Sequence, residues 1–529
     1  MDDRLDLARG TGEVMISRRR FLGGLGATGL LATGCGAVSA ETSGQTLTSA
    51  LPLPRPFTVP LPIPAQARPV RPGHYEVVQR QARMEIVPGT STEVWGFDGT
   101  FPGPTFRLRR ASPVTVRVRN RLPVPTSTHL HGGVTPPGSD GYPTDLVVGE
   151  GHVFRPPTGG HAHHGAAAGA SGWTLHQGFR DYAYPLDQPA ATLWYHDHRM
   201  DFTAPQVWRG LAGFAIVEDD EEDALPLPGG ERDVPLMICD RAFAEDGSFR
   251  YPSKDPGLLE SPGVEDAYME GVEGDVILVN GAPWPVLEVS ATRYRLRLLN
   301  ASNARRYRLR LTPGGRFTQI GSDAGLLAAP VTHEAITIAP GERFDVVVDF
   351  SAHPVGTDVT MVNTLGSGRT RDVMRFRVAR RAREDATVPA RLAGSAPAGP
   401  ALRPASATTR RFDFRRTGQG AGAAWTINGV PFRPGTPLAR PRLGSTEVWR
   451  LTSDFHHPVH VHLAHFQVLS RNGRAPAATD GGWKDTVDVR PYETVDVLVR
   501  FEGFRGRYMM HCHNLEHEDM AMMADFEVV

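Results

Sequence analysis

Short runs of alternating apolar and polar residues recur along most of the chain. Clear examples are VTVRVRN at 114–120, RYRLRLL at 293–299, FDVVVDF at 344–350 and TVDVLVRF at 494–501. Alternation with a period of two, or a β-branched run bounded by turn residues, is typical of β-strands. No amphipathic helix longer than about twelve residues stands out. The pattern predicts an all-β chain built from sandwiches or barrels.

The length of 529 residues favours about three domains, and two stretches of changed composition suggest where they meet. One is acidic and rich in Pro and Gly (218–233), and the other is rich in Arg, Ala and Pro (379–409). The predicted organisation is a signal segment at 1–40, a Pro-rich linker at 41–72, domains at 73–218 and 219–385, a linker at 386–409, and a domain at 410–529.

The first forty residues read as an export signal. Arg18 and Arg19 precede Phe21 and a short Gly-rich apolar stretch, which resembles the twin-arginine signal, and Ala40 ends a small-x-small cleavage site. This predicts export to the periplasm, the cell envelope or the medium. A second interpretation makes Cys35 the anchor of a lipoprotein, and a third makes the segment a disordered tail.

Charge and cysteine content narrow the class of protein. The net charge is −1 and no basic stripe follows the N-terminus, so a nucleic-acid partner is not expected. No later segment is apolar enough to cross a bilayer. Cys239 and Cys512 lie in different contexts and predict no disulfide framework; Cys239 reads as a small buried hydrophobe. The His-rich loop 156–178 reads either as a weak metal site or as a solvated loop.

Four pairs of histidines with a spacing of two are the main candidates for metal ligands. They are His129 and His131, His196 and His198, His460 and His462, and His511 and His513. In a strand, residues i and i+2 point to the same face, so each pair can present two imidazoles to one place. Eight imidazoles exceed the needs of one metal ion, and two pairs come from each end of the chain. The sequence therefore predicts a multi-metal site between domains.

Cys512 lies between two of these histidines and points to the opposite strand face, where it can serve a second metal. One thiolate, two imidazoles and a weak thioether make a blue-copper site. Candidates for the other ligands are His457, His517 and Met522. Zinc would need further cysteines or a closed set of four ligands. The alternative is that Cys512 is an inert core thiol.

Together these motifs resemble the multicopper oxidases, the laccase-type family of cupredoxin domains. The resemblance extends from about 73 to 529 and includes HLHGGVTPPGSDGYP, NASNARRYRLRL, QIGSDAGLL, APGERFDVVVDF and WKDTVDV. These stretches are similar to the branch that contains spore-coat laccase, bilirubin oxidase and phenoxazinone synthase. The resemblance implies three cupredoxin-like Greek-key domains.

The resemblance also implies four copper ions with assigned ligands. The type 1 copper would be held by His457, Cys512, His517 and Met522, and the type 2 copper by His129 and His460. The type 3 pair would be held by His131, His196, His198, His462, His511 and His513.

The family reaction passes single electrons from a reducing substrate through the type 1 copper and reduces dioxygen to water. The branch implies phenols, aminophenols, aromatic amines or bilirubin-like pigments as reductants. Asp140 and Glu518 match carboxylates that deliver protons, although either alone would read as a surface acid. His456 and His465 either line the approach to the type 1 copper or are exposed. Met509, Met510, Met520 and Met523 read as core residues.

Three alternatives remain open at this level. A cuprous-ion oxidase would usually carry a Met-rich insert, and none is found. A two-copper nitrite reductase shares the fold but would not need the complete set of paired histidines. A non-enzymatic exported copper-binding protein remains the third, and the sequence does not predict an oligomeric state.

Overall fold

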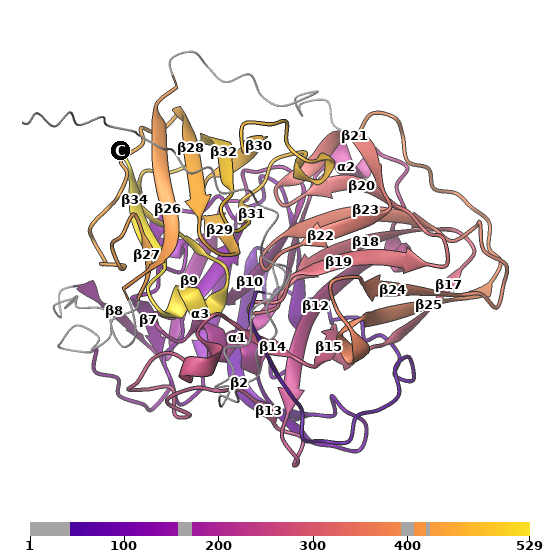
Figure 1. Cartoon of the computed structure of the whole chain (residues 1–529), viewed down its shortest axis with the longest axis horizontal. Helices are drawn as coiled ribbons and strands as arrows, with labels where there is room; N and C mark the ends of the chain where they lie inside the picture. The colour runs from indigo at the N-terminus through magenta and orange to yellow at the C-terminus, as the bar shows by residue number, and fades with distance from the viewer. Residues whose placement is uncertain (1–42, 157–171, 393–406, 419–423) are drawn as a thin grey trace, which may run out of the picture. The chain divides into compact units, whose positions relative to one another are not determined.

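A computed structural model describes residues 43–156, 172–392, 407–418 and 424–529, which are built mainly from β-strands (Figure 1). The α-helices in this part of the chain are short: α1 Thr203–Arg209, α2 Asp220–Asp223 and α3 Leu515–Asp519. Single 3₁₀ turns are η1 Pro137–Ser139, η3 Gly230–Arg232, η4 Asp266–Tyr268, η5 Gly368–Thr370 and η7 Ala478–Asp480. No described helix has the length and apolar character of a membrane span.

The first sandwich consists of two four-stranded sheets with the orders β3-β2-β5-β9 and β4-β11-β10-β6. Side chains from both sheets share one apolar core. The strands are β2 His74–Met84, β3 Thr92–Phe97, β4 Gly103–Arg109, β5 Val114–Asn120, β6 Thr128–His131, β9 Phe179–Tyr184, β10 Ala191–Asp197 and β11 Ala212–Glu218. A small parallel pair, β7 Asp145–Val148 and β8 Thr174–Gln177, lies outside these sheets.

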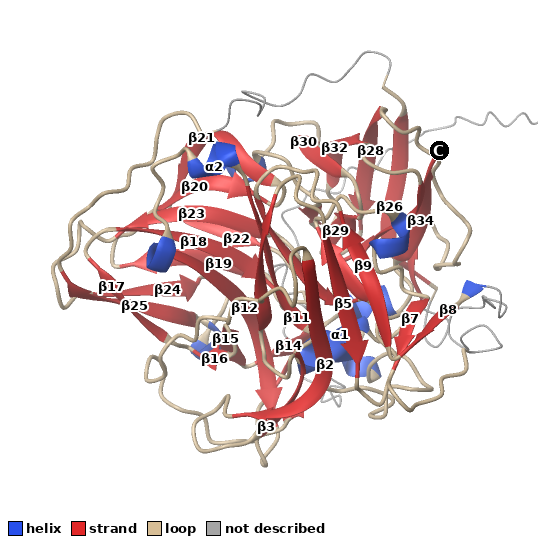
Figure 2. Ribbon diagram, turned by 180° about the vertical axis from the view of Figure 1, so that it is seen from behind, coloured by secondary structure: helices blue, strands red, loops and turns tan. Residues whose placement is uncertain are grey.

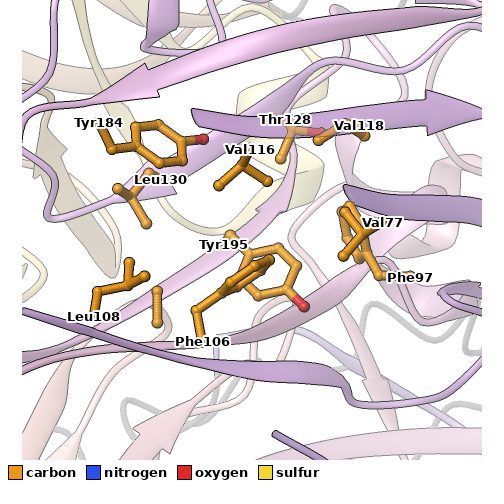
Figure 3. A pocket seen from close by; sticks show the side chains of 11 residues that line it. Val77, Phe97, Phe106, Leu108, Val116, Val118, Thr128, Leu130, Tyr184 and Tyr195 are labelled. Carbon is orange, nitrogen blue, oxygen red and sulfur yellow. The ribbon is translucent and has the colours of Figure 1, made fainter. Parts of the chain in front are cut away.

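Figure 3 shows the interior of this first sandwich. Tyr184, Leu130, Val116 and Tyr195 converge there from strands of both sheets. The space between them is about 10 Å³, roughly that of a single water molecule. It is a packing void of the core and is too small for a substrate.

The middle sandwich has the larger sheet. Its path is β16-β15-β12-β18-β23-β20-β21, with β13 beside β12, and it faces the sheet β17-β25-β24-β19-β22 across one core. The strands are β12 Asp233–Phe243, β13 Phe249–Arg250, β15 Val276–Val279, β16 Ala282–Pro283, β17 Val286–Ser290, β18 Arg293–Asn300, β19 Tyr307–Thr312, β20 Phe317–Ser322, β21 Gly325–His333, β22 Ala335–Ile338, β23 Arg343–Asp349, β24 Asp358–Asn363 and β25 Asp372–Arg380.

The third sandwich packs the sheet β27-β26-β28-β32-β30 against β31-β29-β33-β34. Its strands are β26 Thr409–Thr417, β27 Ala424–Ile427, β28 Thr446–Ser453, β29 His457–Val461, β30 His465–Arg471, β31 Thr486–Val489, β32 Thr494–Arg500, β33 Gly506–Cys512 and β34 Met523–Val528. The reverse view in Figure 2 shows that strands dominate all three sandwiches and that the helices are small connections.

The predicted all-β class with three sandwiches is confirmed, and the four alternating runs became β5, β18, β23 and β32 with bounds within one residue. Within the predicted linker 41–72, β1 Gln45–Leu47 pairs in parallel with β14 Val272–Gly274. The domain boundaries themselves stay predictions. The signal segment 1–40 and most of the His-rich loop lie outside the described residues.

A buried ion cluster joins the start of the middle sandwich to helix α2. Arg295 and Arg297 on β18 pair with Glu222 on α2, and Asp345 on β23 and Asp233 on β12 complete the cluster. All five side chains are less than a tenth exposed. Burial alone would raise the pKa of Glu222, but the Arg297 and Arg295 guanidiniums outweigh it and lower that pKa to about 2.

This cluster should make folding sensitive to acid. Because the pKa of Glu222 is depressed in the folded state, its contribution is present above its ordinary pKa and is lost as pH falls toward about 2. We expect Glu222→Gln to lower the free energy of unfolding by about 3 kcal/mol at pH 7 and by much less near pH 2. Denaturant melts at several pH values measure this, with exposed Glu334→Gln as control. An equal loss at both pH values would contradict the role of the ion pair.

Candidate metal centre

Two antiparallel strand pairs bring the histidine motifs together. In the first sandwich His129 on β6 lies opposite His196 on β10, and in the third His460 on β29 lies opposite His511 on β33. Directly opposite residues of an antiparallel pair point to the same face of the sheet. Each sheet therefore presents four imidazoles on one face, because the partner at i±2 in each motif follows the same direction.

The two imidazole faces meet and interleave. His129 stacks on His462 with ring centroids 3.8 Å apart, and His131 stacks on His460 at 3.6 Å. All eight side chains are at most 1% exposed. We call this set the histidine cluster: His129, His131, His196, His198, His460, His462, His511 and His513. The predicted meeting of the four motifs in space is thus what the structure shows.

The Nε2 atoms of His129 and His460 face each other. The Nδ1 of His129 lies 2.6 Å from the backbone oxygen of Asp140, and the Nδ1 of His460 lies 2.9 Å from that of Asp485. These carbonyls can only accept, so each Nδ1 carries the proton and donates it. The two Nε2 atoms, 3.4 Å apart, then both present lone pairs. A bound cation would resolve that repulsion.

A second group contains His198, His462 and His511. The Nε2 of His511 lies 3.4 Å from that of His198 and 3.2 Å from that of His462. His462 donates from Nδ1 to the Asp140 carboxylate at 2.7 Å, which leaves its Nε2 unprotonated. The three ring nitrogens thus converge as metal ligands would.

The third group is His131, His196 and His513. The Nδ1 of His131, the Nε2 of His196 and both ring nitrogens of His513 are buried without a hydrogen-bond partner. Buried polar nitrogens are normally paired, so this concentration of unpaired ones suits a metal ion. The residues of the cluster are therefore able to hold several metal ions, as the sequence predicted.

The thiol of Cys512 faces the other side of β33. It lies opposite Val459, two residues from His457, and therefore shares a strand face with His457. Its Sγ is 3.3 Å from the Nδ1 of His457 and 3.6 Å from the Nδ1 of His517, and these two nitrogens are 3.1 Å apart. We call these three residues the cysteine site.

Met522 is tied to this site through its backbone. Its N–H donates to His517 and its carbonyl accepts from Cys512, at 3.0 and 3.1 Å, and its side chain is fully buried in the same core. One thiolate, two imidazoles and a nearby thioether match the donor set of a blue-copper centre.

Burial favours the neutral form of most of these imidazoles, which is the form that binds a metal. Burial lowers the pKa of His196 to about 3, and it lowers the pKa of His129 and His198 well below the ordinary value. Burial also raises the pKa of the Cys512 thiol well above its ordinary value. Only a strong cation would stabilise the thiolate here.

The two predicted proton-delivery acids both lie at the histidine cluster. Asp140 is 1% exposed, its carboxylate holds His462, and burial raises its pKa. Glu518 on α3 is also 1% exposed, with one oxygen 3.0 Å from the Nδ1 of His511 and the other 3.7 Å from the Nε2 of His198. Neither is a surface acid.

Sequence reasoning did not assign Asp485, which orients two cluster histidines. Its side chain lies 3.0 Å from the Nε2 of His131 and is paired with the buried guanidinium of Arg343. A Cβ at Gly132 would lie 2.7 Å from both the Asp485 and Arg343 side chains, so the HGG motif needs glycine here. The signal was present in the WKDTVDV and APGERFDVVVDF stretches, which contain Asp485 and Arg343.

Two more unassigned residues shape the cysteine site. The indole of Trp425 on β27 stacks on His517 with centroids 3.7 Å apart. The Asp454 carboxylate lies 3.3 Å from the Nε2 of His457 and is about a quarter exposed. Trp425 comes from a separate strand, so no short spacing links it to the motifs, whereas Asp454 lies only three residues before His457 and was not singled out.

The remaining predictions concern buried side chains. Cys239 is a fully buried free thiol, as expected. The four methionines near Cys512 are also core residues, as predicted: Met509, Met510, Met520 and Met523. His456 is only 3% exposed, so the exposed interpretation was wrong for it. His465 is half-buried and lies 3.1 Å from the carbonyl of Gly132, the residue after His131.

Comparison with known proteins gives a consistent picture. Profiles described as multicopper oxidase match residues 79–153 and 163–222, 251–376, and 403–529. A laccase of Bacillus stratosphericus is 35% identical over 89% of this chain and 99% of its own length. A bilirubin oxidase of Albifimbria verrucaria is 35% identical over 89% of this chain and 81% of its own length. The crystal structure of a laccase from Pediococcus acidilactici Pa5930 superposes with a TM-score of 0.76 and 30% identity, covering 92% of this chain and 96% of that one.

Metal content should distinguish the two sites. We expect the copper-loaded chain to lose about one copper and its thiolate colour on Cys512→Ala, because only the cysteine site uses that thiol. Cys239→Ala is the matched control and should retain both. Removing copper with a chelator should also lower the melting temperature, since bound metal stabilises the folded state. Elemental analysis, visible spectra and thermal melts measure these effects. Equal copper content in the two variants would contradict the assignment.

Proposed function

Because the chain belongs to the multicopper oxidase family and is a copper-dependent, laccase-like oxidoreductase, we propose that it oxidises phenolic, aminophenolic or bilirubin-like reductants one electron at a time and reduces dioxygen to water. One observation carries the proposal: β33 presents Cys512 to the cysteine site on one face and His511 and His513 to the histidine cluster on the other. A single peptide bond on each side separates the two centres.

The proposed ligand sets are those that the family resemblance implies, and the convergence of the ring nitrogens and the thiol supports them. The cysteine site with Met522 would hold a type 1 copper, and His129 and His460 a type 2 copper. The other six imidazoles of the cluster would hold a type 3 pair. When bound, copper supplies the one-electron chemistry and the dioxygen chemistry of the reaction.

The protein's own contribution is orientation, burial and proton handling. The backbone oxygens of Asp140 and Asp485 fix which ring nitrogen of His129 and His460 is protonated. Complete burial of the cluster excludes bulk water. Because dioxygen reduction consumes protons, the carboxylates of Asp140 and Glu518 are positioned to pass them to the cluster.

The surroundings of the cysteine site favour aromatic reductants over cuprous ion. Its outer edge is covered by Trp425, by Phe455, which lies 5.9 Å from His517 between ring centroids, and by the Asp454 carboxylate. That carboxylate is able to take the proton that a phenol releases on oxidation. Among the described methionines, Met84 and Met269 are half-buried and the others are buried, so the structure presents no group of exposed thioethers to a cuprous ion.

The function has a direct test. We expect the copper-loaded chain to show blue thiolate absorption, to consume oxygen with a phenolic dye, and to turn over phenols and bilirubin faster than cuprous ion. Optical spectra and an oxygen electrode measure this, with the Cys512→Ala chain as control. Blue colour without oxygen uptake would reject the oxidase proposal and favour a copper-binding protein.

Glu518 can be tested separately from the blue site. We expect Glu518→Gln to keep the blue colour but to slow reoxidation of the reduced protein by dioxygen about a hundredfold, because a positioned acid contributes on that order. Stopped-flow spectroscopy of the returning blue band measures this rate. Exposed Glu334→Gln is the matched control, and an unchanged rate in Glu518→Gln would remove the proposed proton role.

We also propose that residues 1–40 direct export by the twin-arginine route, on the basis of Arg18, Arg19 and the following apolar stretch. Fused to a reporter, this segment should carry it out of the cytoplasm, and Arg18→Lys with Arg19→Lys should block that transport. Cys35→Ala separates lipoprotein anchoring from soluble export. Continued export of the doubly substituted fusion would exclude the route.

A further inference from the structure

The turn before β23 brings the middle sandwich to the histidine cluster. In the described parts of the chain, no side chain of that sandwich belongs to a group of possible metal ligands. Its residues Gly341 and Arg343 nevertheless lie at the cluster and are buried. Gly341 has a φ of +84°, and a Cβ there would lie 3.0 Å from the ring of His513 and 3.2 Å from that of His131. The turn therefore packs against two imidazoles without contributing one.

Arg343 joins the three sandwiches at this point. Its Nε donates to the carbonyl of Thr192, on β10 of the first sandwich, at 2.9 Å. Two further N–H groups donate to backbone carbonyls of the middle sandwich, those of Gly341 and Asp323, at 2.9 Å each. The last two hold both carboxylate oxygens of Asp485, directly before β31 of the third sandwich. All five donors of this fully buried guanidinium are thus used.

Asp485 extends this attachment to two histidines. Its Oδ1 lies 3.0 Å from the Nε2 of His131, and its backbone carbonyl accepts from the Nδ1 of His460 at 2.9 Å. The hydroxyl of Thr486 donates to the same Oδ1 at 2.8 Å and lies 3.1 Å from the Nε2 of His131. A carboxylate held by a guanidinium only accepts, so the Nε2 of His131 carries the proton. Its unpaired Nδ1 is then left for a metal.

The contacts of Asp485 fit a group that orients ligands better than they fit a ligand. Its carboxylate lies close enough to His131 and His460 to form a metal-binding group with them. Both of its oxygens, however, already accept from Arg343, and Oδ1 also accepts from Thr486 and His131. A metal bound to this fully buried carboxylate would have to displace those donors. The carboxylate therefore supports the histidines from behind, as hydrogen bonds to ligands do at other metal sites.

The junction depends on the shape of the guanidinium as well as on its charge. A lysine at this position would carry the same charge on a single nitrogen with three donors, which cannot reach all three sandwiches at once. The carboxylate of Asp485 would keep a positive partner but lose the fork that binds both of its oxygens. Its hold on His131 and His460 would then loosen.

We propose that Arg343 and Gly341 are positioning residues through which the middle sandwich, which supplies none of the proposed ligands, fixes the orientation of three imidazoles. These are the rings of His131, His460 and His513. The middle sandwich thereby sets the copper affinity of the histidine cluster, whereas the cysteine site on the other face of β33 does not depend on this junction. The inference rests on the proposed function, since it presumes copper in the cluster.

Two buried arginines of the middle sandwich separate this role from general stability. Arg343→Lys should lower the affinity of the type 2 copper about 10- to 100-fold, because the support behind its proposed ligand His460 is weakened. The affinity of the blue copper in the cysteine site should change by less than about twofold. Competition with a chelator measures both, through the electron paramagnetic resonance of the type 2 copper and the absorption of the blue copper.

Arg297→Lys is the matched control for this experiment. Arg297 is also buried in the middle sandwich and is paired with Asp233 and Glu222, which are not among the cluster residues. Both copper affinities should therefore stay unchanged in that variant, even where the protein is less stable.

The outcomes are distinct from those of the oxidase test. Equal loss of both copper signals in Arg343→Lys would mean that the residue only stabilises the fold, and would overturn the inference. So would an Arg343→Lys chain that keeps its type 2 copper as firmly as Arg297→Lys does. An unaltered chain that never shows a type 2 signal would instead reject the proposed function.

Gly341→Ala tests the turn without touching the ion pair, and it serves should Arg343→Lys fail to fold. The added Cβ should displace the rings of His513 and His131, which a crystal structure of the metal-free chain would show. Gly356→Ala is the control, because Gly356 has a similar φ of +93° but open space around the added atom. Unmoved rings in Gly341→Ala would overturn the positioning role, whether or not copper binds.

Discussion

The register between β29 and β33 is the constraint on which both centres depend. Placing His460 opposite His511 and Val459 opposite Cys512 sends the imidazoles to one face and the thiol to the other. A shift of one residue would exchange the two faces and bury the imidazoles in the core of the third sandwich. The apolar core around Cys512 and Met522 therefore fixes the cluster as firmly as it fixes the cysteine site.

The second determinant is the electrostatic character of the interface between the first and third sandwiches. Eight buried imidazoles meet across it, two pairs of them stacked, and burial keeps most of them neutral. Neutral rings avoid the cost of buried charge, yet their facing lone pairs remain unsatisfied. The interface is therefore suited to bind metal cations. The Arg343–Asp485 ion pair and the Asp140 carboxylate hold its histidines in fixed orientations.

Local periodicity was sufficient for strands and for motif faces, and it failed where contacts cross between distant strands. The alternation at 114–120 defines β5 to the residue, and the spacing of two correctly separated Cys512 from His511 and His513. Trp425 and Asp485 reach the sites through tertiary packing, which no short pattern encodes.

The contacts that complete the centre are among the most non-local in the chain. His129 and His460 are 331 positions apart, and His462 and its partner Asp140 are 322 apart. Closing loops of that size costs entropy that is returned only when large apolar surfaces have already packed. The ligand constellation should therefore be among the last parts to assemble, after each sandwich has formed its own core. The histidine cluster can exist only when folding is complete, and a chain arrested before the first and third sandwiches meet would have no pre-formed place to capture the ions of that cluster.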